Sequence, residues 1–282
     1  MSQAAAQVET MIDYLVPSSR INRRFWAPGK ELNTGVYASY PVTVRNARLA
    51  GPFTLDAHGF CLGSHESAIR DFEQQYAPDS AYAAEVAAAV MRLTGADFVV
   101  PMGGMIRDAA ATSATVQPPA AEAHVDFTQR SAERIAARLY ARERPQGAPY
   151  RRFIAFSFWR ALSAPPQDMP LALCEGGSVR DEEGTHNTKV DVAEIPEGEA
   201  LFAPIPGEED MTAATIFHYS SAHRWWYFPD MQPHEVVLIK FYDSDRSKAW
   251  RCPHTAFRDT SRPDAKPRRS IEFRGIAYFT RA

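Results

Sequence analysis

A long series of short, strand-like runs fills the second half of this 282-residue chain and strongly constrains its fold. Each run is rich in β-branched and aromatic residues, which favour strands, while the prolines and glycines between the runs favour turns. Such a series predicts an antiparallel jelly roll, the double-stranded β-helix of cupin-like proteins. We therefore expect a mainly β fold with flanking helices. The runs are 152–162, 170–174, 188–195, 200–204, 213–219, 225–228, 235–242 and 270–280.

The first half of the chain has a more mixed pattern. A helix is expected over 79–94, with Asp79 or Ser80 as its cap and Gly95 at its end, and an amphipathic helix over 130–142. Shorter helices are expected at 7–14 and 65–72, and strands at 37–45, 53–56 and 96–105. Residues 17–35 look irregular. The Ala-, Thr- and Pro-rich stretch 109–121 is expected to be a mobile loop that leads into a strand at residue 124, either a lid over a site or a simply disordered segment.

The length suits one domain, because all-β folds with helical additions often reach this size. The sequence contains no evident internal repeat and no linker. We expect 1–282 to be a single domain. In it, 1–35 forms an N-terminal adapter, 36–121 an α/β support with the lid loop, and 122–282 most of the β-helix core.

Composition argues against several kinds of partner and site. The formal net charge is -3 with 23% charged residues and no basic block, which argues against nucleic-acid and membrane surfaces. Cys61, Cys174 and Cys252 lie far apart, so neither a disulfide framework nor a thiolate zinc site is indicated. No apolar signal segment or membrane span is apparent. We expect a cytoplasmic protein that acts on a small molecule, with a homo-oligomer left open.

His124 and Asp126 form the only His-x-Asp or His-x-Glu pair in the sequence. In an extended backbone, residues i and i+2 project to the same face, so an imidazole and a carboxylate at this spacing can bind one metal ion. Two histidines and one carboxylate form the facial triad of non-haem iron sites. The pair alone also fits an ordinary strand end with two polar residues, so it requires a second histidine.

His254 is the expected second histidine. It lies late in the chain with one more strand after it, and a jelly roll can bring such a position beside an early strand. His223 is the main rival, because it precedes an aromatic cluster. His218 lies in a predicted strand and His234 in a predicted turn. A packed or exposed histidine without a metal is the commoner outcome for any of them.

The last predicted strand begins with a dense run of cations that could bind a carboxylate co-substrate. Iron alone cannot insert oxygen, and 2-oxoglutarate is a common source of the electrons it needs. A guanidinium binds a carboxylate with two parallel hydrogen bonds. Arg268 and Ser270 share one strand face, which Arg274 continues. Which of Arg268, Arg269 and Arg274 binds the co-substrate stays open, as does a solvated basic patch.

Five residues are candidates for substrate binding: Arg107, Arg160, His223, Trp225 and Tyr227. Arg160 could equally form a structural ion pair or a cation–π contact, and Arg107 could lie in an exposed turn. Rings that are consecutive in a strand face opposite sides, so half of the aromatic cluster is expected in the core. No catalytic residue is expected beyond the metal ligands.

These motifs resemble the gibberellin-desaturase-like or AsaB-like hydroxylase/desaturase family of non-haem Fe(II)/2-oxoglutarate-dependent oxygenases. The resemblance implies a double-stranded β-helix, with His124, Asp126 and His254 on iron and 2-oxoglutarate as co-substrate. Trp159-Arg160-Ala161 and Cys174-Glu175 stand where Trp-Arg-Pro and Cys-Asp are expected. The matching stretches are 124–126, 158–162, 170–174, 223–231, 235–240, 242–244, 254–257 and 268–274.

The resemblance implies an oxygenase that uses Fe(II), 2-oxoglutarate and O2 to hydroxylate or desaturate an unactivated C–H bond of a secondary-metabolite-like substrate. Two alternatives stay open. One is a cupin-like metal dioxygenase or isomerase in which Arg268 binds the substrate. The other is a non-enzymatic barrel that binds a small molecule.

Overall fold

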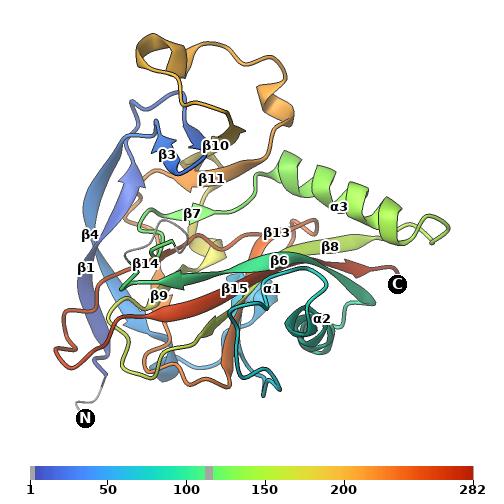
Figure 1. Cartoon of the computed structure of the whole chain (residues 1–282). Coiled ribbons are helices and arrows are strands. Elements are labelled where there is room, and N and C mark those ends of the chain that lie inside the picture. The colour runs from blue at the N-terminus through green and yellow to red at the C-terminus, as the bar shows by residue number, and fades with distance from the viewer. Residues whose placement is uncertain (1–3, 112–116, 282) are drawn as a thin grey trace.

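Two β-sheets of unequal size form the framework of the protein in the computed structural model, which describes residues 4–111 and 117–281 (Figure 1). The larger sheet has the strand order β1-β4-β12-β9-β14-β7-β11-β10-β2-β3, and the smaller sheet has the order β5-β13-β8-β15-β6. The expected mainly β fold with a jelly-roll core is confirmed.

The strands of the larger sheet are β1 (Gln7–Leu15), β2 (Arg23–Ala27), β3 (Lys30–Asn33), β4 (Tyr37–Asn46), β7 (His124–Val125), β9 (Leu171–Cys174), β10 (Gly184–Asp191), β11 (Ala213–Phe217), β12 (Trp225–Tyr227) and β14 (His254–Ala256). Those of the smaller sheet are β5 (Phe60–Ser64), β6 (Phe98–Asp108), β8 (Arg152–Ala161), β13 (Glu235–Asp243) and β15 (Arg269–Phe279).

The two faces of the smaller sheet have different roles, because side chains alternate along a strand. On β15, Ile271 and Phe273 point outward and join an apolar cluster with α2 (Ala81–Thr94). Ser270 and Glu272 alternate with them, on the face toward the larger sheet. On β8, Phe158 points outward with the same cluster, and Trp159 packs inward against residues of β9.

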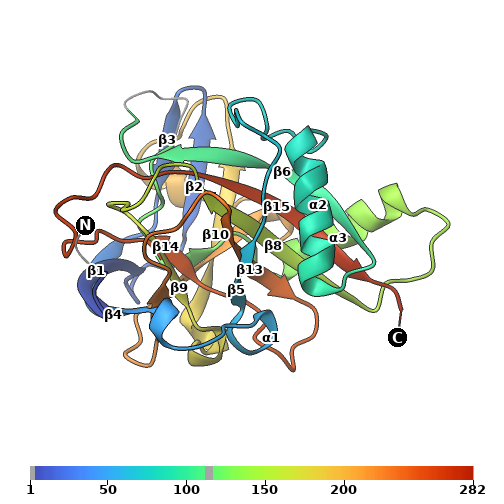
Figure 2. The same ribbon diagram turned by 90° about the horizontal axis from the view of Figure 1, so that it is seen from below.

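Helix α2 covers the outer face of the smaller sheet (Figure 2). The Ser80 hydroxyl accepts a hydrogen bond from the Ala83 amide at its start, and Gly95 ends it at φ 73°, a left-handed conformation that glycine adopts readily. Both signals were readable in the sequence, and this helix is confirmed.

Helix α3 (Gln129–Glu143) begins directly after the strand that carries His124. Thr128 caps it through a reciprocal pair of hydrogen bonds with Ser131. Its buried face joins the main core, where the Tyr278 hydroxyl donates to the Ala136 carbonyl at 2.8 Å. The expected helix over 130–142 is therefore confirmed, and its packing anchors the chain that follows the site. In the described part of the chain, no helix is both long and apolar enough to cross a membrane.

Several local predictions were wrong. Residues 7–14 form strand β1, whose buried Val8, Ile12 and Tyr14 have the period of a strand and pair with β4. Residues 65–72 form no helix, and the predicted strand at 53–56 gives way to the short helix α1 (Leu55–His58) capped by Thr54.

Three further segments differ from the sequence-based expectation. The predicted strand at 200–204 is largely occupied by a 3-10 helix (Gly198–Phe202), and β10 begins and ends four residues before the predicted 188–195. Residues 17–35 are not simply irregular, because they contain β2 and β3. Part of the predicted lid loop, residues 112–116, lies outside the described residues. The division into one domain with an adapter and a support stays a prediction.

Candidate active site

Strand register brings the two predicted histidines together. His254 of β14 lies directly opposite His124 of the antiparallel neighbour β7, so both side chains share one face of the larger sheet. Their ring centroids are 4.5 Å apart. Ile216 of β11 pairs with His124 on its other side. His124 and His254, 130 positions apart in the chain, thus face the interior side by side.

Asp126 lies at the end of β7 on the same side as His124. Its Oδ1 is 3.7 Å from His124 Nε2. Its Oδ2 is 3.0 Å from Arg274 Nε on the facing sheet, close enough for an ion pair, although the N–H direction is too poor for a hydrogen bond. The carboxylate is therefore held between the histidine pair and a cation.

Both histidines offer the same ring nitrogen to the interior. The Nδ1 of His124 lies 2.9 Å from the Glu122 carbonyl, and the Nδ1 of His254 lies 3.2 Å from the Cys252 carbonyl. Because a carbonyl only accepts hydrogen bonds, each Nδ1 carries the proton and each Nε2 keeps a lone pair. Metal-binding histidines usually donate their other ring N–H to a carbonyl or a carboxylate in this way.

The electrostatics at His254 also suit a metal ligand. Burial and the neighbouring His124 lower the pKa of His254 to about 4. Its imidazole is therefore neutral at physiological pH, which is the form that binds metal ions.

The donor set fits Fe(II), whose open sites are typically built from two imidazoles and one carboxylate. Among the described residues, however, no group of three His, Cys, Asp or Glu side chains has a ready metal-binding arrangement. The pairing of Asp126 with Arg274 gives a physical reason, since it draws the carboxylate toward the facing sheet. The assignment of His124, Asp126 and His254 as ligands stays a prediction.

Arg268 is buried in a cavity that both histidines also line. Its Nη1 donates to the Met169 carbonyl at 2.7 Å, but its Nε has no partner, and it forms no ion pair with a described acidic residue. Burial and the nearby Arg107 lower the pKa of Arg268 to about 9, which still leaves it charged at neutral pH. A buried cation without a counter-ion is costly unless an anion binds it.

Two hydroxyl groups on the inward faces of β8 and β15 are buried and lack hydrogen-bond partners among the described residues: Ser157 Oγ, which lines this cavity, and Ser270 Oγ, which is not part of its lining. Trp159 also lines the cavity, with the guanidinium of Arg268 5.5 Å from its ring centroid. Sequence reasoning missed Ser157 and Trp159 as site residues. The alternation of side chains along β8, which places positions 157 and 159 on one face, was the sequence signal that could have identified them. Ser157 and Arg268 thus offer donors to a carboxylate in this cavity, and Trp159 forms an aromatic wall.

The other two arginines of the predicted cation run have different surroundings. Arg274 pairs with Asp126 and, at 2.6 Å, with Glu272. Arg269 points to the outer face, where it pairs with Glu73 and Asp108. Of the three, only Arg268 has no acidic partner among the described residues. Arg274 is thus ion-paired with Asp126 and Glu272, and its assignment to the co-substrate stays a prediction.

Glu272 is a further residue that sequence reasoning left without a role. Its carboxylate lies between Arg274 and Arg107, at 2.6 and 3.6 Å. Both guanidinium groups lower its pKa, so it is ionised in the folded protein. This chain of alternating charges links Asp126 to Arg107 and neutralises the cations around the histidines.

A second cavity adjoins the first, and the two share Arg107, Ala120 and His124, while Asp126 lines only the second. Arg107 belongs to it, as the sequence suggested, and its guanidinium donates to the Pro118 carbonyl at 3.0 Å. The remaining described walls are mixed in character: Trp26, Met105, Ala214 and Ile216 are apolar, and Arg24, Glu122, Asn187 and Lys189 are polar or charged.

The structure does not bring the other four substrate candidates to these cavities. Trp225 and Tyr227 are buried on the sheet face opposite to the one that carries Trp226 and Leu173. His223 is also buried: its Nε2 lies 3.0 Å from Glu183 and its Nδ1 2.9 Å from the Tyr14 hydroxyl.

Arg160 alternates with Trp159 on β8 and therefore faces outward. The motif that contains it was noticed in the sequence, but without the strand register the inward residue could not be told from the outward one.

Comparisons with known proteins agree with this arrangement. Residues 12–278 match the family described as Oxidoreductase/YMDC permease-like domain. The chain is 29% identical over 260 residues to the hydroxylase/desaturase efuI of Hormonema carpetanum, covering 86% of this chain and 85% of that protein. It is 30% identical over 234 residues to the Fe(II)/2-oxoglutarate-dependent dioxygenase nvfI of Aspergillus novofumigatus, covering 80% and 78%.

The fold is also similar to the solved structure of the iron and alpha-ketoglutarate-dependent endoperoxidase NvfI, with a TM-score of 0.79 at 25% identity over 98% of this chain and 99% of that one. With nearly the whole chain matched, this protein belongs to the hydroxylase/desaturase family of non-haem Fe(II)/2-oxoglutarate-dependent oxygenases.

Proposed function

We propose that His124, Asp126 and His254 hold Fe(II) in this enzyme, and that Arg268 and Ser270 bind the distal carboxylate of 2-oxoglutarate. The observation that carries the proposal is the buried guanidinium of Arg268, which has no acidic partner among the described residues and shares a cavity with both histidines. In this proposal, one carboxylate of 2-oxoglutarate faces the two histidines and the other faces Arg268.

The chain supplies geometry and electrostatics to the reaction. The Glu122 and Cys252 carbonyls fix both imidazoles in the tautomer that leaves Nε2 free. The Met169 carbonyl and the Trp159 ring hold the guanidinium of Arg268 in place. Preorganised groups of this kind need no rearrangement when the co-substrate binds.

When bound, iron, 2-oxoglutarate and O2 supply an oxidising power that amino-acid side chains lack. The protein positions the substrate C–H bond and keeps bulk water away from it. The cavity lined by Trp26, Met105 and Ile216 is the proposed substrate site, because His124 and Asp126 line it and Arg268 does not. Its mixed walls suit a small organic molecule that is oxidised by hydroxylation or desaturation.

A small-molecule substrate and a cytoplasmic location are part of the proposal. The three cysteines are free thiols in the structure, which suits a reducing compartment. The nearly balanced charge gives no reason to expect a nucleic-acid or membrane partner.

Anaerobic titration tests the metal assignment. Protein loaded with Fe(II) should bind one equivalent of iron and develop a visible charge-transfer band when 2-oxoglutarate is added. The Asp126→Ala and His254→Ala variants should lose stoichiometric iron, while His218→Ala, which removes a histidine whose ring contacts the Leu15 carbonyl, should retain it. Full iron retention in either of the first two variants would overturn the ligand set.

A further inference from the structure

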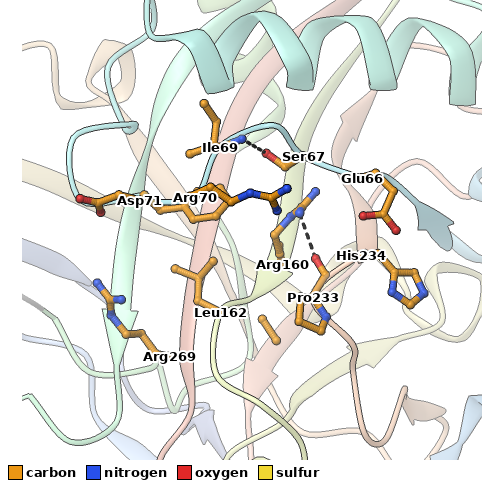
Figure 3. Close-up of a pocket in the computed structure, with 12 residues that line it drawn as sticks. Glu66, Ser67, Ile69, Arg70, Asp71, Arg160, Leu162, Pro233, His234 and Arg269 are labelled. Atoms are coloured by element: carbon orange, nitrogen blue, oxygen red, sulfur yellow. Dashed lines mark hydrogen bonds between the residues drawn. The ribbon is translucent and has the colours of Figure 1, made fainter.

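A separate cavity, called the outer cavity below, lies behind the active site on the outer face of the smaller sheet (Figure 3). Like the inner cavity of Arg268, it contains an arginine without an acidic partner among the described residues. Its residues face outward because side chains alternate between the two faces of the sheet along the neighbouring strands β8 and β15. On β8, Trp159 faces the active site and Arg160 faces this outer cavity. At the start of β15, Arg269 faces outward, and Arg268, directly before the strand, faces inward. The two cavities are therefore back to back across the sheet, and they share no lining residue.

Arg160 is the buried cation of the outer cavity, with 3% of its surface exposed. Its Nη1 donates to the Pro233 carbonyl at 2.9 Å, and its Nη2 donates to the His65 carbonyl at 2.9 Å and to the neutral His65 ring at Nδ1. These contacts hold the guanidinium in place, but carbonyls do not neutralise its charge. Its Nε has no partner, and it forms no ion pair with any acidic residue that the structure describes.

The aromatic neighbours compensate only part of this charge. The guanidinium carbon of Arg160 is 5.9 Å from the ring centroid of Phe72 and 5.7 Å from that of Tyr82. Cation–π contacts at such distances contribute less than a close counter-ion does. A buried cation with fixed donors and no counter-ion is a typical feature of anion sites.

The rest of the cavity favours an anion at this position. Arg70 extends toward Arg160 in Figure 3 and forms no ion pair within the described residues. Glu66 and Asp71 also line the cavity, but both are exposed, and Figure 3 shows them on opposite sides of the two arginines. Arg269, at the edge, is already neutralised by Glu73 and Asp108.

From this arrangement we propose that the outer cavity is a binding site for a small oxyanion, a carboxylate or a phosphate, held between Arg160 and Arg70. Both kinds of anion offer two or more oxygens to guanidinium N–H groups. The site is separate from the active site and does not depend on the assignment of iron or 2-oxoglutarate.

Calorimetric titration of the full chain with inorganic phosphate at constant ionic strength tests the proposal. We expect one saturable site. Arg70→Gln should raise its dissociation constant about tenfold, by loss of one charge-assisted contact. Arg138→Gln, a matched change on the exposed face of α3, should leave the constant unchanged. Because Arg70 is exposed, its substitution should not disturb folding. Arg160→Gln, if folded, should abolish saturation.

A second titration separates the two anions and the two cavities. In an Arg268→Gln background, which removes the inner cation, succinate should still bind to the outer site if that site accepts carboxylates, and Arg70→Gln should weaken that binding. If phosphate alone saturates the site, the ligand is of phosphate type. The proposal is overturned if neither anion saturates, or if Arg70→Gln leaves both constants unchanged.

Discussion

Arg268 and Arg269 are neighbours in the sequence at the start of β15, and their side chains lie on opposite sides of the smaller sheet. Arg268 is buried, unpaired with any described acid and close to Trp159, whereas Arg269 is partly exposed and pairs with Glu73. At the scale of single residues, the surroundings rather than the residue type decide which arginine can bind a co-substrate. This difference gives a direct test with a built-in control.

Arg268→Gln should raise the dissociation constant of 2-oxoglutarate about 100-fold, because a buried charge-assisted contact to its carboxylate is lost. Iron binding should not change. Arg269→Gln should alter the constant less than about twofold, since its charge is outside the cavity. Titration of the anaerobic Fe(II) protein, monitored by the charge-transfer band, measures both. Equal effects of the two substitutions would refute the assignment.

Glu183 illustrates a different residue-scale effect, on stability. Its carboxylate accepts hydrogen bonds from the Arg180 backbone amide and side chain and lies 3.0 Å from His223 Nε2. Burial alone would raise its pKa, but these contacts outweigh burial and lower the pKa to about 2. Its folded pKa is thus below the unfolded value, so its stabilisation is complete above the unfolded pKa and is lost as the pH falls.

Glu183→Gln should therefore lower the free energy of unfolding at pH 7 by about 1–2 kcal/mol, after allowance for solvent screening. The difference from the unaltered protein should shrink as the pH is lowered from about 4.5 toward 2. Urea unfolding at several pH values measures this. A difference that grows on acidification would contradict the ionised, hydrogen-bonded carboxylate.

At the scale of elements, β15 connects most parts of the site. It pairs with β8 on one side and β6 on the other, and its inward face carries Ser270, Glu272 and Arg274. Close contact with β6 depends on Gly104, where an added Cβ would lie 2.4 Å from the Glu272 carbonyl oxygen and 2.8 Å from the Phe273 ring. Such positions accept no side chain unless the strands separate.

Gly104→Ala should therefore destabilise the protein by about 1–3 kcal/mol through overpacking. It should also weaken 2-oxoglutarate binding, because β15 shifts. Gly177→Ala is the control, since no atom lies within 4 Å of its added Cβ and its φ is not in the left-handed region. Thermal unfolding and the 2-oxoglutarate titration report the two effects. Equal stability of the two variants would show that β6 and β15 adapt freely.

At the scale of the whole molecule, elements far apart in the sequence share one core. Tyr14 of β1 and Tyr278 of β15 belong to the same buried cluster, which also includes residues of α3. A core shared in this way predicts cooperative unfolding of the N-terminal strands with the β-helix.

Calorimetry of the metal-free protein should accordingly show one unfolding transition, with the van't Hoff enthalpy equal to the calorimetric enthalpy. Saturating Fe(II) and 2-oxoglutarate should raise the transition temperature without splitting it, because both are expected to bind only the folded chain. Two separate transitions would instead assign residues 1–35 to an independent adapter.

The order of residue types was enough to predict the mainly β fold, helices α2 and α3, the pair His124 and Asp126, and the inward face of β15. These features depend on local periodicity, on capping residues and on alternation along a strand, all of which can be read from neighbouring positions. The choice of His254 over His223 depended on its place late in the chain and on the Arg268-x-Ser270 pattern after it, and the resemblance to a family then agreed with it.

Only the tertiary structure decided what depends on partners distant in sequence. The pairing with β4 made β1 a strand, and strand register placed Trp159 inward and Arg160 outward. Ion pairs with acidic residues distinguish Arg269 and Arg274 from Arg268, which has none among the described residues. The pairing of Trp226 with Leu173 places Trp225 on the sheet face away from the site. Long-range contacts of this kind leave no periodic signal in the sequence, because each depends on which strands become neighbours.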